Sequence, residues 1–167
     1  YTYTIPVEQL NTPLEICAFS TKSKTWYDRT ITFKSEGMQF QGLKEDSYEY
    51  VKGADDQTYT VTTDSKMFVV TASTLKSTSK GMMARFTLKS TGYDMLYLGS
   101  KEDAENDDGK NWITFCETKG EGENQQYVFE IPVSALNTSI PIATHGTKSK
   151  KWFNHTITFN FNTNTVD

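Results

Sequence analysis

Hydrophobic and polar positions alternate with a period of two through most of the chain. The alternation recurs in short runs bounded by turn residues such as Thr63-Asp64 and Gly99-Ser100. A period of two places successive side chains on opposite faces of an extended backbone, and short runs at regular spacing are typical of antiparallel sheets. The pattern therefore predicts strands at residues 58–62, 67–70, 83–88 and 97–98, and an all-β fold.

One segment departs from this alternation. Residues 100–106 begin with Ser100, which is a good N-cap, and are rich in acidic side chains near their amino end. The positive end of the helix dipole favours acidic residues at that place. We expect a short helix here that ends before the turn at Gly109.

The chain repeats itself at a distance of 126 residues. Residues 3–33 align without a gap on residues 129–159, and the matches include Thr-Lys-Ser-Lys at 21–24 and 147–150 and Trp26 with Trp152. The stretch between the two copies occurs once. The simplest account is a tandem duplication in which the first copy lacks its front part. An alternative, which the sequence leaves open, keeps both copies in one pseudo-symmetric sandwich.

The predicted fold is an immunoglobulin-like antiparallel β-sandwich, present as one complete copy plus the C-terminal strands of a preceding copy. We expect residues 1–36 to be the C-terminal part of the first copy, residues 37–57 a connecting segment, and residues 58–167 the complete second copy. Two strands alone bury little apolar surface and leave open edges. We expect the first-copy strands to be completed from outside this sequence, by an upstream part of the natural chain or by strand pairing with a neighbouring molecule.

Charge and composition limit the classes of partner that the chain can bind and the location that we expect for it. The chain has 17 basic and 21 acidic residues, a formal net charge of -4, and lacks the positive field that binding to nucleic acid requires. No apolar run is long enough for a membrane span, and we expect any export signal or anchor to lie outside these residues. The high content of Thr, Ser, Asn and Tyr is typical of exported β proteins, which favours an extracellular or cell-surface location.

The two cysteines, Cys17 and Cys116, each lie in a stretch that alternates like a strand. We expect two buried free thiols rather than a disulfide, because buried cysteine behaves as a small hydrophobic residue.

Catalytic groupings are not visible in the sequence, so we expect no enzyme activity, and no spacing of His, Cys or acidic residues indicates a metal site. Tyr93, Met95 and Tyr97 alternate on one face of a predicted strand. Such residues are usually core, but they also suit a hydrophobic ligand. His155, close to Trp152, is either a satisfied surface histidine or a ligand to haem or metal.

The order of features from residue 67 to 159, especially residues 92–102, Ile131-Pro132-Val133 and Lys151-Trp152, resembles a repeat domain of exported proteins from Gram-positive Clostridia and relatives. The Trp26-Tyr27-Asp28-Arg29 stretch resembles it too. The resemblance implies a tandem-repeat module of a cell surface.

The strand order is also similar to the near-iron-transporter domains, which bind haem through a tyrosine in a Tyr-x-x-x-Tyr pattern near the last strand. Tyr27 matches the first tyrosine, whereas Ile31 stands at the second position and Phe153 replaces Tyr27 in the second copy. Phenylalanine has no oxygen to bind iron, so this similarity supports the fold more than the activity.

Two functions therefore remain open. The first is a non-enzymatic structural or adhesive module of a surface or filament protein, whose partners are other copies of the module or neighbouring chains. The alternative is a haem-binding module, in which Tyr27 of the first copy and Tyr93 or His155 of the second are the possible iron ligands. Met95 and Trp152 complete the candidate ligand-binding residues.

Overall fold

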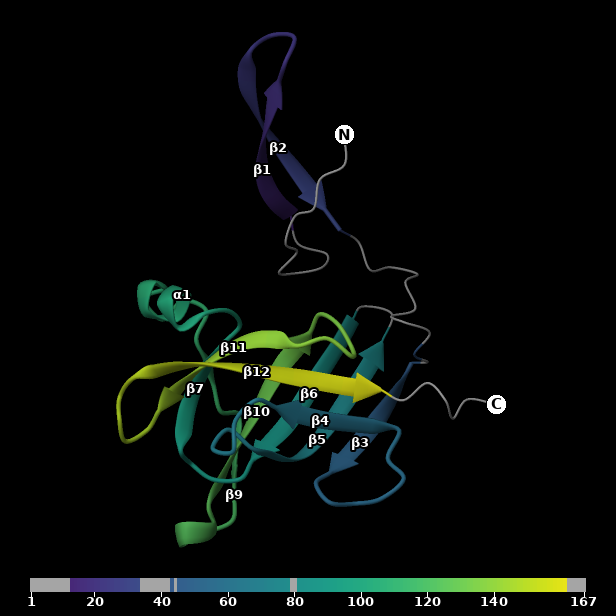
Figure 1. Cartoon of the computed structure of the whole chain (residues 1–167), viewed down its shortest axis with the longest axis vertical. Coiled ribbons are helices and arrows are strands. Elements are labelled where there is room, and N and C mark those ends of the chain that lie inside the picture. Colours follow the sequence, from purple (N-terminus) through teal and green to yellow (C-terminus); the bar gives the residue numbers. More distant parts are fainter. Residues whose placement is uncertain (1–12, 34–42, 44, 79–80, 162–167) are drawn as a thin grey trace.

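The computed structural model describes residues 13–33, 43, 45–78 and 81–161, and it shows antiparallel sheets with one α-helix in that part of the chain (Figure 1). The strands are β1 (Pro13–Ser20), β2 (Thr25–Thr32), β3 (Asp46–Val51), β4 (Tyr59–Thr63), β5 (Val70–Thr78), β6 (Gly81–Leu88), β7 (Tyr93–Tyr97), β8 (Ile113–Thr114), β9 (Glu117–Lys119), β10 (Gln126–Val133), β11 (Ile140–Gly146) and β12 (Trp152–Phe161). The helix α1 spans Lys101–Asn106, and a 3-10 turn spans Gly122–Asn124.

Two five-stranded sheets form a sandwich. One sheet has the strand order β3-β5-β6-β10-β9 and the other has the order β4-β12-β11-β7-β8, with antiparallel pairing between neighbours. The chain crosses repeatedly between the sheets: β3 is followed by β4 in the opposite sheet, and the β5–β6, β7–β8, β9–β10 and β11–β12 pairs then alternate. The predicted all-β antiparallel sandwich is confirmed.

The start of the sandwich differs from the expected boundary. Residues 37–57 were expected to connect the two copies, yet β3 lies within them and pairs with β5 over its whole length. Tyr50 of β3 and the nearby Leu43 are buried in the core. Most side chains of β3 are polar, because β3 is an edge strand with one face open to solvent, so its alternation is weak in the sequence. The sandwich therefore begins before Thr58.

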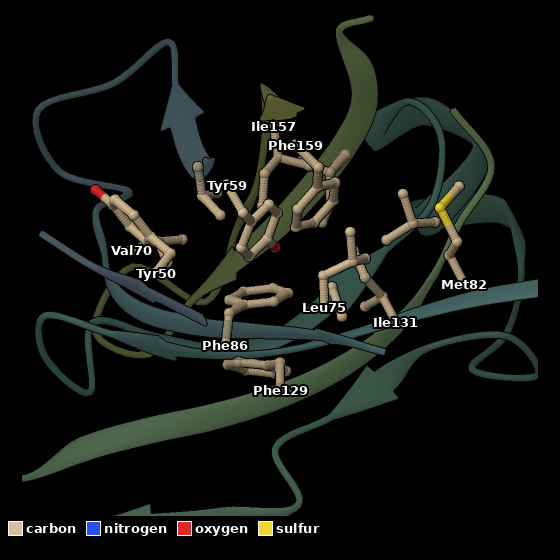
Figure 2. Packing of buried hydrophobic residues seen from close by; sticks show 14 of the residues in the cluster. Tyr50, Tyr59, Val70, Leu75, Met82, Phe86, Phe129, Ile131, Ile157 and Phe159 are labelled. Carbon is tan, nitrogen blue, oxygen red and sulfur yellow. The ribbon is translucent and has the colours of Figure 1, made fainter. Parts of the chain in front are cut away.

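The core fills the space between the sheets with aromatic and branched side chains (Figure 2). Phe159 of β12 meets Phe86 of β6 across this space, with ring centroids 6.5 Å apart, and stacks on Tyr59 of β4 at the same separation. The Tyr59 hydroxyl lies 2.9 Å from the hydroxyl of Ser73 in the opposite sheet. Burial raises the pKa of Tyr59, so this phenol stays neutral and its hydrogen bond joins the two sheets.

The predicted helix is present, and its cap is the expected one. Ser100 is the N-cap, and its hydroxyl accepts a 3.1 Å hydrogen bond from the Asp103 backbone amide in a capping box. Trp112 covers the helix by donating its indole N–H to the Ala104 carbonyl at 2.8 Å.

The first-copy hairpin β1–β2 has the same register as the second-copy hairpin β11–β12. Leu14 pairs with Ile31 in the first hairpin, and the residues 126 positions later, Ile140 and Ile157, pair in the second. The correspondence continues along both ladders as far as Phe19 with Trp26 and His145 with Trp152. The turns agree as well, since Lys24 and Lys150 have φ values of 54° and 55°. The repeat in the sequence is therefore a repeat in local structure.

The surroundings of the two hairpins differ. Strands β11 and β12 lie between β7 and β4, whereas β1 and β2 pair with each other in a separate two-stranded sheet (Figure 1). None of residues 13–33 is buried, although the second-copy counterparts of Ile16 and Ile31, namely Ile142 and Ile157, are fully buried. Trp26 is 65% exposed and Trp152 only 7%. Neighbouring strands, rather than the hairpin sequence, decide burial here.

The expectation of buried cysteines is wrong, although both thiols are free. Cys17 and Cys116 are exposed. Cys17 corresponds to the fully buried Ala143 of β11. It is exposed because no element among the described residues covers that face of β1. An alternating pattern shows which residues share a face of a strand, but it does not show whether that face becomes buried.

We predict a large difference between two substitutions on β6. Phe86→Ala removes a ring that is 1% exposed and should lower the free energy of unfolding by about 3–5 kcal/mol. Met83→Ala, three residues earlier on the solvent side with 39% exposure, should cost below about 1 kcal/mol. Urea unfolding followed by circular dichroism measures both, and equal losses would contradict the placement of the core.

We also predict that Asp28 slows the chemistry of Cys17. The Cys17 thiol donates a 3.4 Å hydrogen bond to the Asp28 carboxylate, and this bond, with some burial and the acidic neighbours, raises the pKa of Cys17. Because the thiolate is the reactive form, Asp28→Asn should lower that pKa and speed alkylation of Cys17 by iodoacetamide at pH 8. The rate at Cys116 is the internal control, and an unchanged Cys17 rate would refute the proposed influence of Asp28.

Candidate functional site

The five candidate ligand-binding residues lie in three separate places. Tyr27 is on β2, outside the sandwich sheets. Tyr93 and His155 meet in one aromatic cluster, and Met95 and Trp152 meet in another. The structure therefore joins the candidates in pairs rather than in one site.

Tyr27 lies on an exposed hairpin surface. Its ring is 40% exposed, and its hydroxyl donates a 3.1 Å hydrogen bond to the Ser23 hydroxyl in the adjoining turn. The Arg29 guanidinium lies 5.1 Å from the ring centroid, at cation–π distance. These contacts hold the Tyr27 side chain against the hairpin. The positive charge of Arg29 beside the Tyr27 ring disfavours the binding of a metal cation there.

Tyr93 and His155 belong to an aromatic cluster at one end of the main core. The His155 ring stacks on Phe68 at 5.4 Å and meets the Tyr93 ring edge-on at 5.9 Å. Its Nδ1 donates to the Asp64 carboxylate at 3.1 Å, since a carboxylate only accepts. Burial raises the pKa of Tyr93, so its phenol stays neutral. These contacts give the His155 ring a hydrogen-bond partner and packing neighbours. They also connect β12 to the segment that follows β4.

Met95 and Trp152 lie on the other face of the second sheet, under α1. Both pack in a small cluster with Ala104 of the helix and Ala143 of β11. Trp112 meets Trp152 with ring centroids 5.3 Å apart. Small residues at 104 and 143 let the helix approach the sheet closely, so this cluster is the packing that docks α1.

The prediction that Tyr93, Met95 and Tyr97 share one face is wrong for Tyr93. Met95 and Tyr97 pack in the cluster under α1, whereas Tyr93 packs against the main core. The ladder between β11 and β7 shifts at this point: His145 pairs with Met95, and the next residue, Gly146, pairs with Tyr93. The additional residue on β7 is Asp94, and such a bulge reverses the facing of the residues beyond it.

The bulge gives Asp94 a defined role that the sequence did not indicate. Its Oδ1 lies 2.6 Å from Nδ1 of His145, and its Oδ2 lies 3.7 Å from the Lys150 ammonium. The His145 ring also packs against Trp152, with centroids 5.3 Å apart. Asp94 thus clamps the end of the β11–β12 hairpin to β7. Asp64 does the same for His155 at the other edge, and only the ladder registers could have revealed either carboxylate.

A shallow cavity of about 390 Å³ lies elsewhere on the sandwich, at the ends of β3, β4 and β5. Its lining contains three lysines and several hydroxyl groups but no acidic side chain: Tyr50, Lys52, Val61, Thr62, Thr63, Ser65, Lys66, Val69, Val70 and Lys89. Such donors suit an anionic group. None of the five candidate residues borders this cavity.

A haem does not fit the residues that were predicted to bind it. An axial ligand must project into an apolar slot, and the second-copy position that corresponds to Tyr27 is Phe153, which has no ligand atom. His155 stacks on Phe68 and hydrogen-bonds Asp64, while Tyr93 is held in the core edge. The candidates are used in packing contacts.

A scan of family models, a search of curated proteins and a search of solved structures found no match for the chain. Within the described ranges, no helix has the length and apolar character needed to cross a membrane. Over the same residues, no group of three or more His, Cys, Asp or Glu side chains is arranged to hold a metal ion.

We predict that the absorption spectrum of haemin mixed with the protein does not depend on Tyr27 or His155. Because Tyr27 and His155 lie on different sheets, Tyr27→Phe and His155→Gln should leave the Soret region of haemin mixed with the protein unchanged from wild type. A titration followed by visible spectroscopy measures this, with free haemin as reference. A Soret shift that either substitution abolishes would contradict the placement of these residues.

Proposed function

We propose that this chain is a non-enzymatic module of an extracellular tandem-repeat protein, with a structural or adhesive role at a cell surface or in a filament. Other copies of the module, joined by strand pairing, are its proposed partners. The observation that carries the proposal is the hairpin β1–β2, which repeats the β11–β12 hairpin but has no flanking strand among the residues that the structure describes.

The duplicated hairpin supports an array of modules. Duplication of a whole unit is typical of arrays, in which each unit contacts its neighbours. In the complete module, both outer edges of the β11–β12 hairpin form ladders, one to β7 and one to β4. The corresponding edges of β1 and β2 have no ladder within the described residues. Open strand edges recruit further strands through backbone hydrogen bonds.

The apolar face of the hairpin supports the same role. Leu14, Ile16, Ile31 and Phe33 are half-buried, whereas the side chains that correspond to the last three are fully buried in the sandwich. Packing these residues against another strand pair removes apolar surface from water, which stabilises association by about 25 cal/mol per Å². A second copy offers the same hairpin, so two such faces cover each other.

We predict concentration-dependent association that requires this face. Wild-type protein should shift to larger species between micromolar and millimolar concentration in sedimentation velocity. Ile16→Asp/Ile31→Asp should remain monomeric, because two carboxylates at these positions make burial of the face unfavourable.

The matched control is Thr30→Asp/Thr32→Asp, which adds the same charge to the other face of the hairpin and should still associate. A wild-type protein that stays monomeric throughout, or a double Ile variant that associates like wild type, would refute pairing through this hairpin.

A further inference from the structure

The sandwich has one place for a hairpin of the repeated type, and the chain carries two such hairpins. The place lies between β7 and β4, and β11–β12 occupies it. Because β1–β2 has the same register and turn, its backbone fits the same place. We propose that the two hairpins compete for this place within one chain, so that the protein exchanges between two arrangements of the same sandwich. This exchange goes beyond the proposed role in assembly and does not depend on it.

The apolar contacts support exchange. Ile16, Ile31 and Phe33 carry the same side chains as Ile142, Ile157 and Phe159, which are all fully buried. Trp26 repeats Trp152, whose ring packs with Trp112 and the helix residue Ala104. The side chains that fill the core and dock α1 are therefore available from either hairpin.

Two of the three charged contacts of the resident hairpin also keep a basic residue on β1–β2. Lys24 corresponds to Lys150, which lies 3.7 Å from Asp94. Arg29 corresponds to His155, so exchange places a guanidinium opposite Asp64 in place of an imidazole. An arginine is charged at every physiological pH and pairs well with a carboxylate. Both clamping carboxylates thus find a basic partner on β1–β2.

Two positions favour the resident hairpin. Cys17 is larger than the fully buried Ala143, and Phe19 lacks the ring nitrogen with which His145 bonds Asp94. These differences explain why β11–β12 occupies the place in the structure. The exchanged form is a minor state, with a population on the order of 0.1–10%.

The chain is long enough to connect the exchanged hairpin. In that arrangement Phe33 takes the position of Phe159, near the end of β12. Phe161, two residues beyond, packs edge-on against Tyr48 of β3 with ring centroids 4.9 Å apart. Residues 34–45 join Phe33 to β3, and a connection of 12 residues spans up to about 40 Å when extended. The ends to be joined are therefore close together compared with the connection.

Exchange within the chain is favoured over exchange between chains. Each chain has two hairpins and one place, so insertion into a second copy displaces one hairpin for every one that it inserts. Such a swap forms no additional contacts and also loses translational freedom. The tethered hairpin gains the same contacts without that loss.

A disulfide trap tests the exchange in an otherwise stable chain. Thr158 faces Thr62 in the ladder between β12 and β4, and Thr32 corresponds to Thr158. With Cys17→Ala and Cys116→Ser as background, Thr32→Cys/Thr62→Cys should form a disulfide within the monomer under mild oxidation. Facing strand residues have Cα separations that suit a disulfide. Peptide mapping identifies the bond, and non-reducing gels distinguish monomer from dimer.

Two matched cysteine pairs serve as controls for the disulfide experiment. Thr158→Cys/Thr62→Cys reports the resident arrangement and should close faster. Thr32→Cys/Thr74→Cys places the second thiol on β5 of the opposite sheet and reports random collision, so it should close more slowly than the Thr32–Thr62 pair. No Thr32–Thr62 bond, a rate no faster than that of the collision pair, or a bond found only between chains would overturn the proposal.

A second measurement uses the natural cysteines. Ile142→Asp/Ile157→Asp makes the resident hairpin unsuitable for the core, so β1–β2 should replace it and the sandwich should stay folded. Cys17 then takes the buried position of Ala143, and the number of rapidly reactive thiols should fall from two to one, with Cys116 still reactive. Adding Ile16→Asp/Ile31→Asp removes the replacement and should unfold the sandwich. If Ile142→Asp/Ile157→Asp alone unfolds the protein with both thiols reactive, the proposal is wrong.

Discussion

The contact between the inner faces of β12 and β6 holds the rest of the structure in place. Phe159 joins Phe86 across the sandwich and Tyr59 within its own sheet, so the two layers share one continuous core. Strand β12 is also the central partner of β4 and β11. Its outer face receives α1, because the Lys101 amide donates to the Asn154 side chain at 2.6 Å. A single strand therefore positions the opposite sheet, both of its neighbours and the helix.

The two hairpins separate local from tertiary effects. Their sequences are related, their registers coincide, and each turn has a lysine with φ in the left-handed region. The β11–β12 hairpin is nevertheless buried, whereas β1–β2 is not. Local sequence is therefore sufficient to specify the pairing within a hairpin. Burial is added by flanking strands and by the facing sheet, and these contributions supply most of the stabilisation of a β structure in water.

Ion pairs and hydrogen bonds hold the β11–β12 hairpin to the strands on both of its sides. Asp94 holds His145 and Lys150 at the β7 edge, and Asp64 holds His155 at the β4 edge. The first hairpin carries a basic residue at two of these three positions, Lys24 and Arg29. The pattern connects the proposed assembly role to the proposed exchange, because the same edges and the same apolar face serve a second copy or the chain's own sandwich.

The sequence by itself determined the fold class, the capped helix and the repeat, because each depends on near neighbours: alternation along a strand, Ser100 with Asp103, and matched residues at a constant separation. It did not determine β3, the exposure of the cysteines or the face of Tyr93. Each of these depends on contacts with segments distant in sequence. Strand β5 pairs with β3, no described strand covers the Cys17 face of β1, and β11 pairs with β7 across the bulge at Asp94. It also named five ligand-binding candidates, of which Tyr93, His155, Met95 and Trp152 lie in two packing clusters and Tyr27 lies on the first hairpin. Alternation assigns residues to faces but does not show which side chains from other strands pack against them.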